Sequence, residues 1–243
     1  MRHAHVISSV AILAAITISG CNSGSKTLGV PGAGTGSVPI GSINRGINNF
    51  RILAGSTVTS TGGTRITGDV GVWPGSAVTG FGPGTMSGNG GLPHVADAAA
   101  KAAQADLTIA YNDAAGRPMK ATVAGNIGGQ TLTPGVYKST SSLAISSGDL
   151  TLDAQGNSSS VFIFQVASAL TVTSGRKVIL SGGALASNVF WQVGSSATLG
   201  TTSDFSGTIL ANTSVSILTG ATLHGRALAR SAEVSMQTNS VVQ

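Results

Sequence analysis

The sequence predicts a mostly β fold built from stacked coils, and the C-terminal half of the chain supplies the main evidence. Five short segments between residues 142 and 243 alternate one apolar residue with one small or hydroxyl residue, which is typical of strands buried on one face. Their second apolar positions recur along the chain and are Ile145, Val172, Leu199, Ile217 and Met236. A repeat of roughly two dozen residues indicates stacked coils rather than a closed sandwich.

Further apolar segments interleave with these five, at residues 161–166, 188–193 and 207–211, with 226–229 as a weaker fourth. They are apolar on both faces in places, so we expect them to be covered on both sides.

A single helix is the predicted cover, over about residues 94–116, because this stretch is rich in alanine. Asp97 lies in its first turn, and Gly116 and Pro118 end it. The apolar stripe expected to pack on the sheet at helical spacing is Val95, Ala99, Ala102, Ala105 and Ile109.

The outward positions of the five alternating segments are small or hydroxylated, apart from Glu233 at the end of the series. A solvated strand face usually carries long charged side chains, which aid solubility and block edge pairing. We therefore interpret these positions as a surface for a flat, uncharged, repeating partner, although plain solvated strands also tolerate Ser and Thr. A face nearer the turn at Thr219–Thr222 is the rival location. The candidate binding residues are Ser142, Ala144, Ser146, Thr171, Thr173, Ser196, Thr198, Ser214, Ser216, Thr219, Thr222 and Ser235.

The N-terminal part of the chain contains a targeting segment and a linker. Residues 1–20 have a positive charge at Arg2 followed by a short apolar run that ends just before Cys21. This run is too short for a stable transmembrane helix and predicts a signal peptide. Residues 18–21 resemble the lipobox of bacterial lipoproteins, which implies lipid on Cys21; the alternative is an ordinary signal peptide with an incidental cysteine. Residues 21–46 are rich in Gly, Ser and Pro and read as a flexible tether.

The folded domain is predicted to span residues 47–243. Its first part, up to residue 92, contains strand-like segments and the sequence Thr61-Gly62-Gly63-Thr64, which is matched later by Thr219-Gly220-Ala221-Thr222. We expect this part to add a coil to the same stack.

Composition argues against several classes of function. Charged residues are 9% and aromatic residues 4% of the chain, and the net charge of +5 is spread along it; nucleic-acid binders cluster basic residues and interleave aromatics. Metal-ligand spacings and a G-x-S-x-G nucleophile elbow are missing from the sequence. We therefore expect no enzyme activity, no cofactor, no metal and no nucleic-acid partner.

Six motifs in the same order resemble the microbial ice-binding proteins of the DUF3494 family. They lie at residues 53–59, 68–75, 133–137, 161–166, 188–194 and 225–229, so the resemblance covers about residues 48–243. It implies a right-handed, discontinuous β-solenoid of triangular section with one long helix alongside. It also implies adsorption to ice through one flat face, on which Thr-Ala/Gly-X-Thr/Asn motifs are frequent. Glu233 departs from the uncharged pattern.

The resulting hypothesis is a monomeric ice-binding protein that slows ice growth and recrystallisation. Lipid on Cys21 would be its contact with a membrane, which implies an exported, outer-membrane lipoprotein at the cell surface or on the periplasmic side, with release from the membrane as a further option. The alternative is a surface adhesin or structural β-solenoid that binds polysaccharide or another cell. Carbohydrate sites usually display aromatic rings, and neither Trp73, beside a proline, nor Trp191, in an apolar segment, is expected to be exposed.

Overall fold

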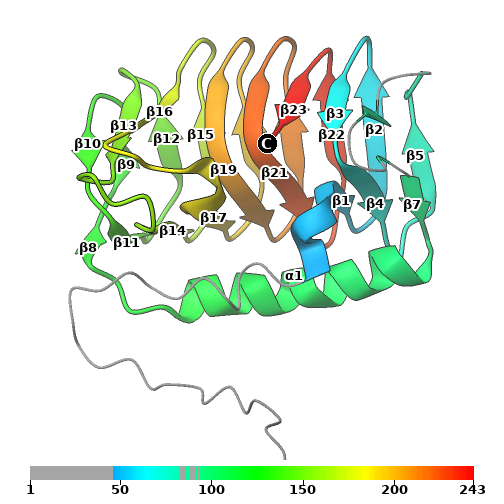
Figure 1. Cartoon of the computed structure of the whole chain (residues 1–243), viewed down its shortest axis with the longest axis horizontal. Helices are drawn as coiled ribbons and strands as arrows, with labels where there is room; N and C mark the ends of the chain where they lie inside the picture. The colour runs from blue at the N-terminus through cyan, green and yellow to red at the C-terminus, as the bar shows by residue number, and fades with distance from the viewer. Residues whose placement is uncertain (1–45, 83–85, 88–90, 92) are drawn as a thin grey trace, which may run out of the picture. The chain divides into compact units, whose positions relative to one another are not determined.

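The computed structural model describes residues 46–82, 86–87, 91 and 93–243. The predicted signal peptide, Cys21 and nearly all of the predicted tether lie outside the described residues. Within the described part, parallel strands stack coil upon coil, with one long helix beside them (Figure 1). The predicted β-solenoid is therefore confirmed, while its right hand stays a prediction.

The first part of the chain forms short strands at one end of the stack. Its elements are η1 (Gly46–Asn49), β1 (Phe50–Ala54), β2 (Thr57–Thr61), β3 (Arg65–Thr67), β4 (Asp69–Val72), β5 (Ala77–Thr79), β6 (Met86–Ser87) and β7 (Pro93–Val95). The helix α1 (Ala98–Gly116) follows.

The rest of the chain then builds the stack from the other end. Its elements are β8 (Ala121–Thr122), β9 (Gly125–Asn126), β10 (Thr131–Leu132), β11 (Gly135–Ser139), β12 (Leu143–Ile145), β13 (Leu150–Asp153), β14 (Phe162–Val166), β15 (Leu170–Val172), β16 (Val178–Ser181), η2 (Ala186–Asn188), β17 (Val189–Val193), β18 (Ala197–Leu199), β19 (Asp204–Ala211), β20 (Val215–Ile217), β21 (Thr222–Ala229), β22 (Val234–Gln237) and β23 (Ser240–Val242).

The strands form three faces. The first is the eight-stranded sheet β5-β2-β22-β20-β18-β15-β12-β9, which we call the uncharged face because the outward positions at the middle of its strands carry no charged side chain. The second, the helix-covered face, contains β1, β4, β11, β14, β17 and the second halves of β19 and β21. The third, the groove-bearing face, contains β10, β13 and β16 and continues through the first halves of β19 and β21 to β23 and β3.

Two glycines make the corner between the groove-bearing and helix-covered faces. Gly207 of β19 pairs with Gly225 of β21, and their φ angles are 121° and 150°. A Cβ on Gly225 would lie 2.0 Å from the carbonyl oxygen of Gly207. Only glycine fits such a close approach, so both long strands turn this corner together.

Stacked aromatic rings fill the interior between the faces. Trp191 lies 3.9 Å from Phe164 and 5.0 Å from Phe205, measured between ring centroids, and Tyr137 stacks on the other side of Phe164. The indole N–H of Trp191 donates to the carbonyl oxygen of Ser206 over 3.1 Å. Trp191 is fully buried, as predicted.

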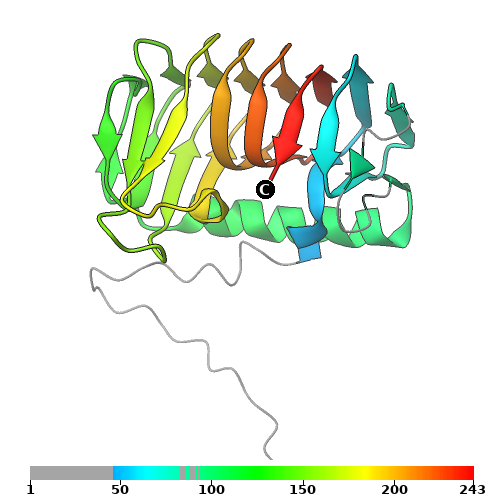
Figure 2. The same cartoon turned by 45° about the horizontal axis from the view of Figure 1, so that its top comes forward.

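The helix α1 packs against the helix-covered face and runs along the stack (Figure 2). It carries the chain from β7 at one end to β8 at the other. Gln104 Nε2 donates to Ala229 O over 3.0 Å, and Gln165 Nε2 donates to Ala114 O over 2.8 Å. Two buried amides therefore anchor the helix to the sheet.

The helix begins four residues later than predicted, because Pro93–Val95 pairs with β4 as a strand. Asp97 is the N-cap and accepts the Ala100 N–H over 2.8 Å. That hydrogen bond, together with one to His94, holds the pKa of the Asp97 carboxyl below its usual value.

The predicted packing stripe of the helix was wrong. Val95 is 40% and Ile109 46% exposed, and Ala99, Ala102 and Ala105 also face solvent. The buried side is Ala100, Ala103, Gln104, Leu107, Ala110 and Ala114. Alanines occur on both sides of this helix, so they do not mark a face, and the larger Leu107 decides which side packs.

Candidate functional site: the uncharged face

The eight strands of the uncharged face pair in register, so their outward side chains fall into straight columns. The central column, from one end to the other, is Asn126, Ala144, Thr171, Thr198, Ser216, Ser235, Thr59 and Thr79. Neighbours within a column lie about 4.8 Å apart, and outward positions along one strand repeat at about 6.7 Å. The columns therefore form a two-dimensional grid of short side chains.

Buried residues on both sides of the central column hold the grid level. The inward positions Leu143, Leu170, Ala197, Val215, Val234 and Val58 form one buried row. The predicted periodic positions Ile145, Val172, Leu199, Ile217 and Met236 form the second. Both rows belong to one continuous hydrophobic core, so the packing of their side chains holds the strands in place from the interior of the solenoid.

Hydroxyl groups on the face are fixed by bonds to their neighbours. Ser214 Oγ donates to Ser196 Oγ over 2.8 Å, and Ser235 Oγ donates to Ser216 Oγ over 3.2 Å. Thr173 Oγ1 donates to the carbonyl oxygen of Ile145 over 3.2 Å. Threonine is also restricted at χ1, so the side chains of this surface have little conformational freedom.

Most of the predicted binding residues meet on this face. Ala144, Thr171, Thr198, Ser216 and Ser235 form the central column. Ser142, Ser196 and Ser214 belong to the column on the N-terminal side of the strands, and Ser146 and Thr173 to the column on the C-terminal side.

The N-terminal coils extend the face further than predicted. β2 pairs with β22 and β5 pairs with β2, which adds Thr57, Thr59, Thr61 and Thr79. The prediction that this part contributes a coil to the same stack is therefore confirmed, although its threonines were not placed on the face. The alternation of Thr57, Thr59 and Thr61 with Val58 and Ser60 was the signal that could have located them.

Glu233 is not at the end of its column. Val234 pairs with Val215 on one side and with Val58 on the other, so Glu233 lies between Ser214 and Thr57. Among the described outward positions of the three columns it is the one charged side chain. It lies in the marginal column, next to the helix-covered face, and the central column is free of charge.

The turn at Thr219–Thr222 does not belong to the grid. Thr219 is exposed in the turn after β20, and its Oγ1 donates to Gln237 Oε1 over 3.0 Å. Thr222 pairs with Asp204 and Ser240, so it lies on the groove-bearing face.

The match between Thr61–Thr64 and Thr219–Thr222 is one residue out of register. Ser240 pairs with both Thr222 and Arg65, so Thr222 corresponds to Arg65, and Thr64 is fully buried. The two motifs therefore do not form one threonine array, and the rival location loses its support.

In the part of the chain that the structure describes, no three His, Cys, Asp or Glu residues are placed to share a metal ion. No described helix has the length and apolar character needed to cross a membrane.

Comparison with known proteins identifies the family to which this chain belongs. The sequence model of the family described as Ice-binding-like matches residues 52–242. The chain belongs to this family.

Ice-binding proteins from several organisms resemble this member of the family along most of their length. The ice-binding protein of Nostoc sp. (strain HG1) is 42% identical over 95% of this chain and 80% of its own. That of Flavobacterium frigoris (strain PS1) is 40% identical over 82% of this chain and 75% of its own. The resemblance seen in the sequence motifs is therefore confirmed.

Solved structures of ice-binding proteins share the fold. The crystal structure of an ice binding protein from an Antarctic biological consortium has a TM-score of 0.81 and 55% identity, over 88% of this chain and 95% of that one. The structure of an ice-binding protein from an Arctic yeast, which is described as the structural basis for its antifreeze activity, has a TM-score of 0.75 and 35% identity, over 85% of this chain and 94% of that one. Both structures cover more than four fifths of this chain.

Proposed function

We propose that this member of the ice-binding-like family adsorbs to ice through the uncharged face and slows ice growth and recrystallisation. The observation that carries the proposal is the in-register central column of eight uncharged side chains across an eight-stranded sheet. The helix-covered face is occupied by α1, and the groove-bearing face carries charges and a hollow. The uncharged face is thus the remaining large flat surface.

The physical basis is many weak contacts made at once. Threonine methyl groups hold neighbouring water in an ordered arrangement, and hydroxyl groups anchor that water to the protein. One hydrogen bond contributes about 0.5–1.5 kcal/mol net, but a rigid grid makes many together, with little ordering cost. An ice front then bulges between adsorbed molecules and stops advancing.

Substituting Glu into the central column tests the location of the site. We expect Thr171→Glu and Thr198→Glu each to lower thermal hysteresis about tenfold or more, because a carboxylate keeps its own water shell and is costly to desolvate. Thr151→Glu is the matched control, since Thr151 is a half-buried outward threonine of β13 on the groove-bearing face. It should keep wild-type activity, and all three variants should melt near the wild-type temperature.

The two possible negative results have different meanings: one rejects ice binding, and the other rejects only the location of the site. If wild-type protein leaves ice crystals unshaped and does not slow their recrystallisation, ice binding itself is rejected. If both central-column variants remain fully active while the wild type shapes ice, the site lies on another face.

We also propose that the chain is exported and held at a membrane by lipid on Cys21, with residues 22–45 as the tether. The support is the short apolar segment before Cys21, the one cysteine of the sequence, and the Gly/Ser/Pro-rich stretch after it. Labelled fatty acid fed to expressing bacteria should be incorporated into the wild type and not into Cys21→Ala. Equal labelling of the two, or none in the wild type, would reject the anchor.

A further inference from the structure

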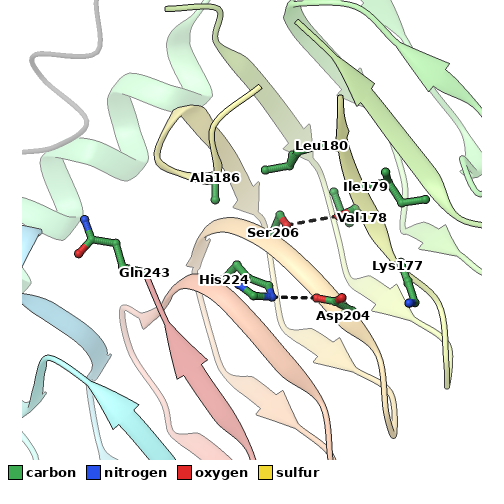
Figure 3. A pocket seen from close by; sticks show the side chains of 9 residues that line it. All are labelled: Lys177, Val178, Ile179, Leu180, Ala186, Asp204, Ser206, His224 and Gln243. Carbon is green, nitrogen blue, oxygen red and sulfur yellow. Dashed lines mark hydrogen bonds and ion pairs between the residues drawn. The ribbon is translucent and has the colours of Figure 1, made fainter. Parts of the chain in front are cut away.

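A groove of about 520 Å³ opens on the groove-bearing face between β16 and β19 (Figure 3). Ile179 and Leu180 of β16 lie on one side, Ser206 and His224 on the other, and Ala186 of the η2 loop lies over one end. The site proposed for ice does not use it.

The groove exists because two neighbouring strands separate. β16 pairs with β13 along its whole length, but it meets β19 only through the bridge between Lys177 and Asp204. Beyond that bridge, the carbonyl oxygen of Val178 accepts the hydroxyl of Ser206 over 3.3 Å instead of a backbone N–H. Leu180 is the next residue whose backbone points to this side, since backbone groups alternate along a strand. The groove therefore has a strand edge as one wall.

Apolar side chains are unusually exposed here. Ile179 is 42% exposed, and Leu185, next to Ala186, is 47% exposed. A strand edge flanked by exposed apolar side chains is the kind of surface to which an extended segment adds as a further strand.

The described chain begins on the helix-covered face, close to the corner that borders the groove-bearing face. Arg51 Nη2 donates to Gln243 Oε1 over 2.8 Å, and Gln243 lines the groove. Arg226 Nη2 donates to the carbonyl oxygen of Asn48 over 3.5 Å, and Arg226 follows His224 by two residues on β21. The start of the described chain is therefore separated from the groove by this one corner, a distance that a short extended segment can span.

We propose that residues 36–45 of this chain dock in the groove as an extended segment along the edge of β16. Val38 and Ile40 are two residues apart, so both face the same way in an extended chain. Their apolar side chains would lie on the outer side of β16, beside the exposed Ile179. Pro39 between them lacks an N–H and is tolerated in an edge strand. The six residues from Gly46 to Ile40 reach up to about 20 Å.

Docking would change how the domain is held. The free linker after Cys21 would shorten from about 25 residues to about 15, which reduces its root-mean-square reach from about 28 Å to about 21 Å. It would also fix the point at which the tether leaves the domain, on a face other than the uncharged one. Docking in the groove is independent of what the uncharged face binds.

Hydrogen exchange in the full chain tests the docking. We expect the Leu180 amide to exchange about tenfold faster in the double variant Val38→Asp/Ile40→Asp. This factor corresponds to a wild-type protein in which the docked state is about ten times more populated than the undocked state. The Ile179 amide points to β13 and serves as the internal reference. The matched control is Leu28→Asp/Val30→Asp, which carries the same changes outside the proposed segment and should leave Leu180 unaffected. Equal exchange at Leu180 in all three proteins overturns the proposal, and so does protection that rises with protein concentration, which would indicate a second copy in the groove.

Cross-linking provides a second measurement in a Cys21→Ser background. Ile40→Cys combined with Ile179→Cys should form an intramolecular disulfide under mild oxidation. Ile40→Cys combined with Thr198→Cys, on the uncharged face, should not. Equal yields from the two pairs would mean that the segment samples the surface without docking.

Discussion

The uncharged face and the groove-bearing face are made by the same coils, yet they differ in regularity and charge. Across the uncharged face eight strands pair without a break. On the groove-bearing face the pairing is reduced to one bridge between β16 and β19, and Lys177, Asp204 and Arg65 lie on pairing positions. A coil stack therefore does not make every side regular. A level face requires uninterrupted pairing from strand to strand, which the uncharged face has and the groove-bearing face loses between β16 and β19.

The largest expected effect is a loss of stability when the packing of α1 against the sheet is weakened, because both faces depend on the same core. Leu107→Ala should lower the free energy of unfolding by about 2–5 kcal/mol, because Leu107 is fully buried between α1 and the sheet. Ile109→Ala, on the exposed side of the same helix, should cost far less. Urea unfolding followed by circular dichroism measures both. Equal losses in the two variants would contradict the packing of α1 described here.

A smaller effect should define how far the binding surface extends. Thr59→Glu places a carboxylate in the central column of the N-terminal coil, and we expect thermal hysteresis to fall several-fold, because this end of the grid stops contributing. Thr67→Glu is the control, on the same coil but on the groove-bearing side. Undiminished activity in Thr59→Glu would limit the site to the coils after the helix.

The smallest expected effect is a gain. Glu233→Ser removes the one charge from the described outward positions of the grid, so we expect thermal hysteresis to rise modestly. Glu233→Gln keeps the size of the side chain and should give part of the rise, because the charge is the main obstacle. A fall in both variants would show that Glu233 supports the surface instead of interrupting it.

The regular face could be predicted from sequence because its signal is local. Alternation with a period of two places Thr171 and Thr198 outward and Val172 and Leu199 inward, whatever the neighbouring strands do. The order of the strands followed from the repeat. The place of β2 beside β22 depends on a contact between the two ends of the chain, which no local pattern contains.

The sequence-based predictions failed where side chains are small or where neighbouring strands separate. Alanines on both sides of α1 hid the packing face, and Pro93–Val95 became a strand because β4 offered it a partner. The groove depends on the point at which β16 leaves β19, and neither strand carries a residue type that marks this point. Thr222 was misplaced because the turn after β20 crosses a corner of the coil, so Thr222 begins β21 on the groove-bearing face.

The pairing of β1 with β21 and of β2 with β22 joins the first strands of the domain to its last ones. β1 and β2 are synthesised early, but the strands with which they pair lie near the C-terminus. The stack can therefore be completed only when both parts of the sequence are present. Contacts between such distant residues slow folding. A chain truncated before residue 222 would lack β21 and β22, so β1 and β2 would have no strands to pair with. The candidate surface would therefore be complete only in the full-length chain.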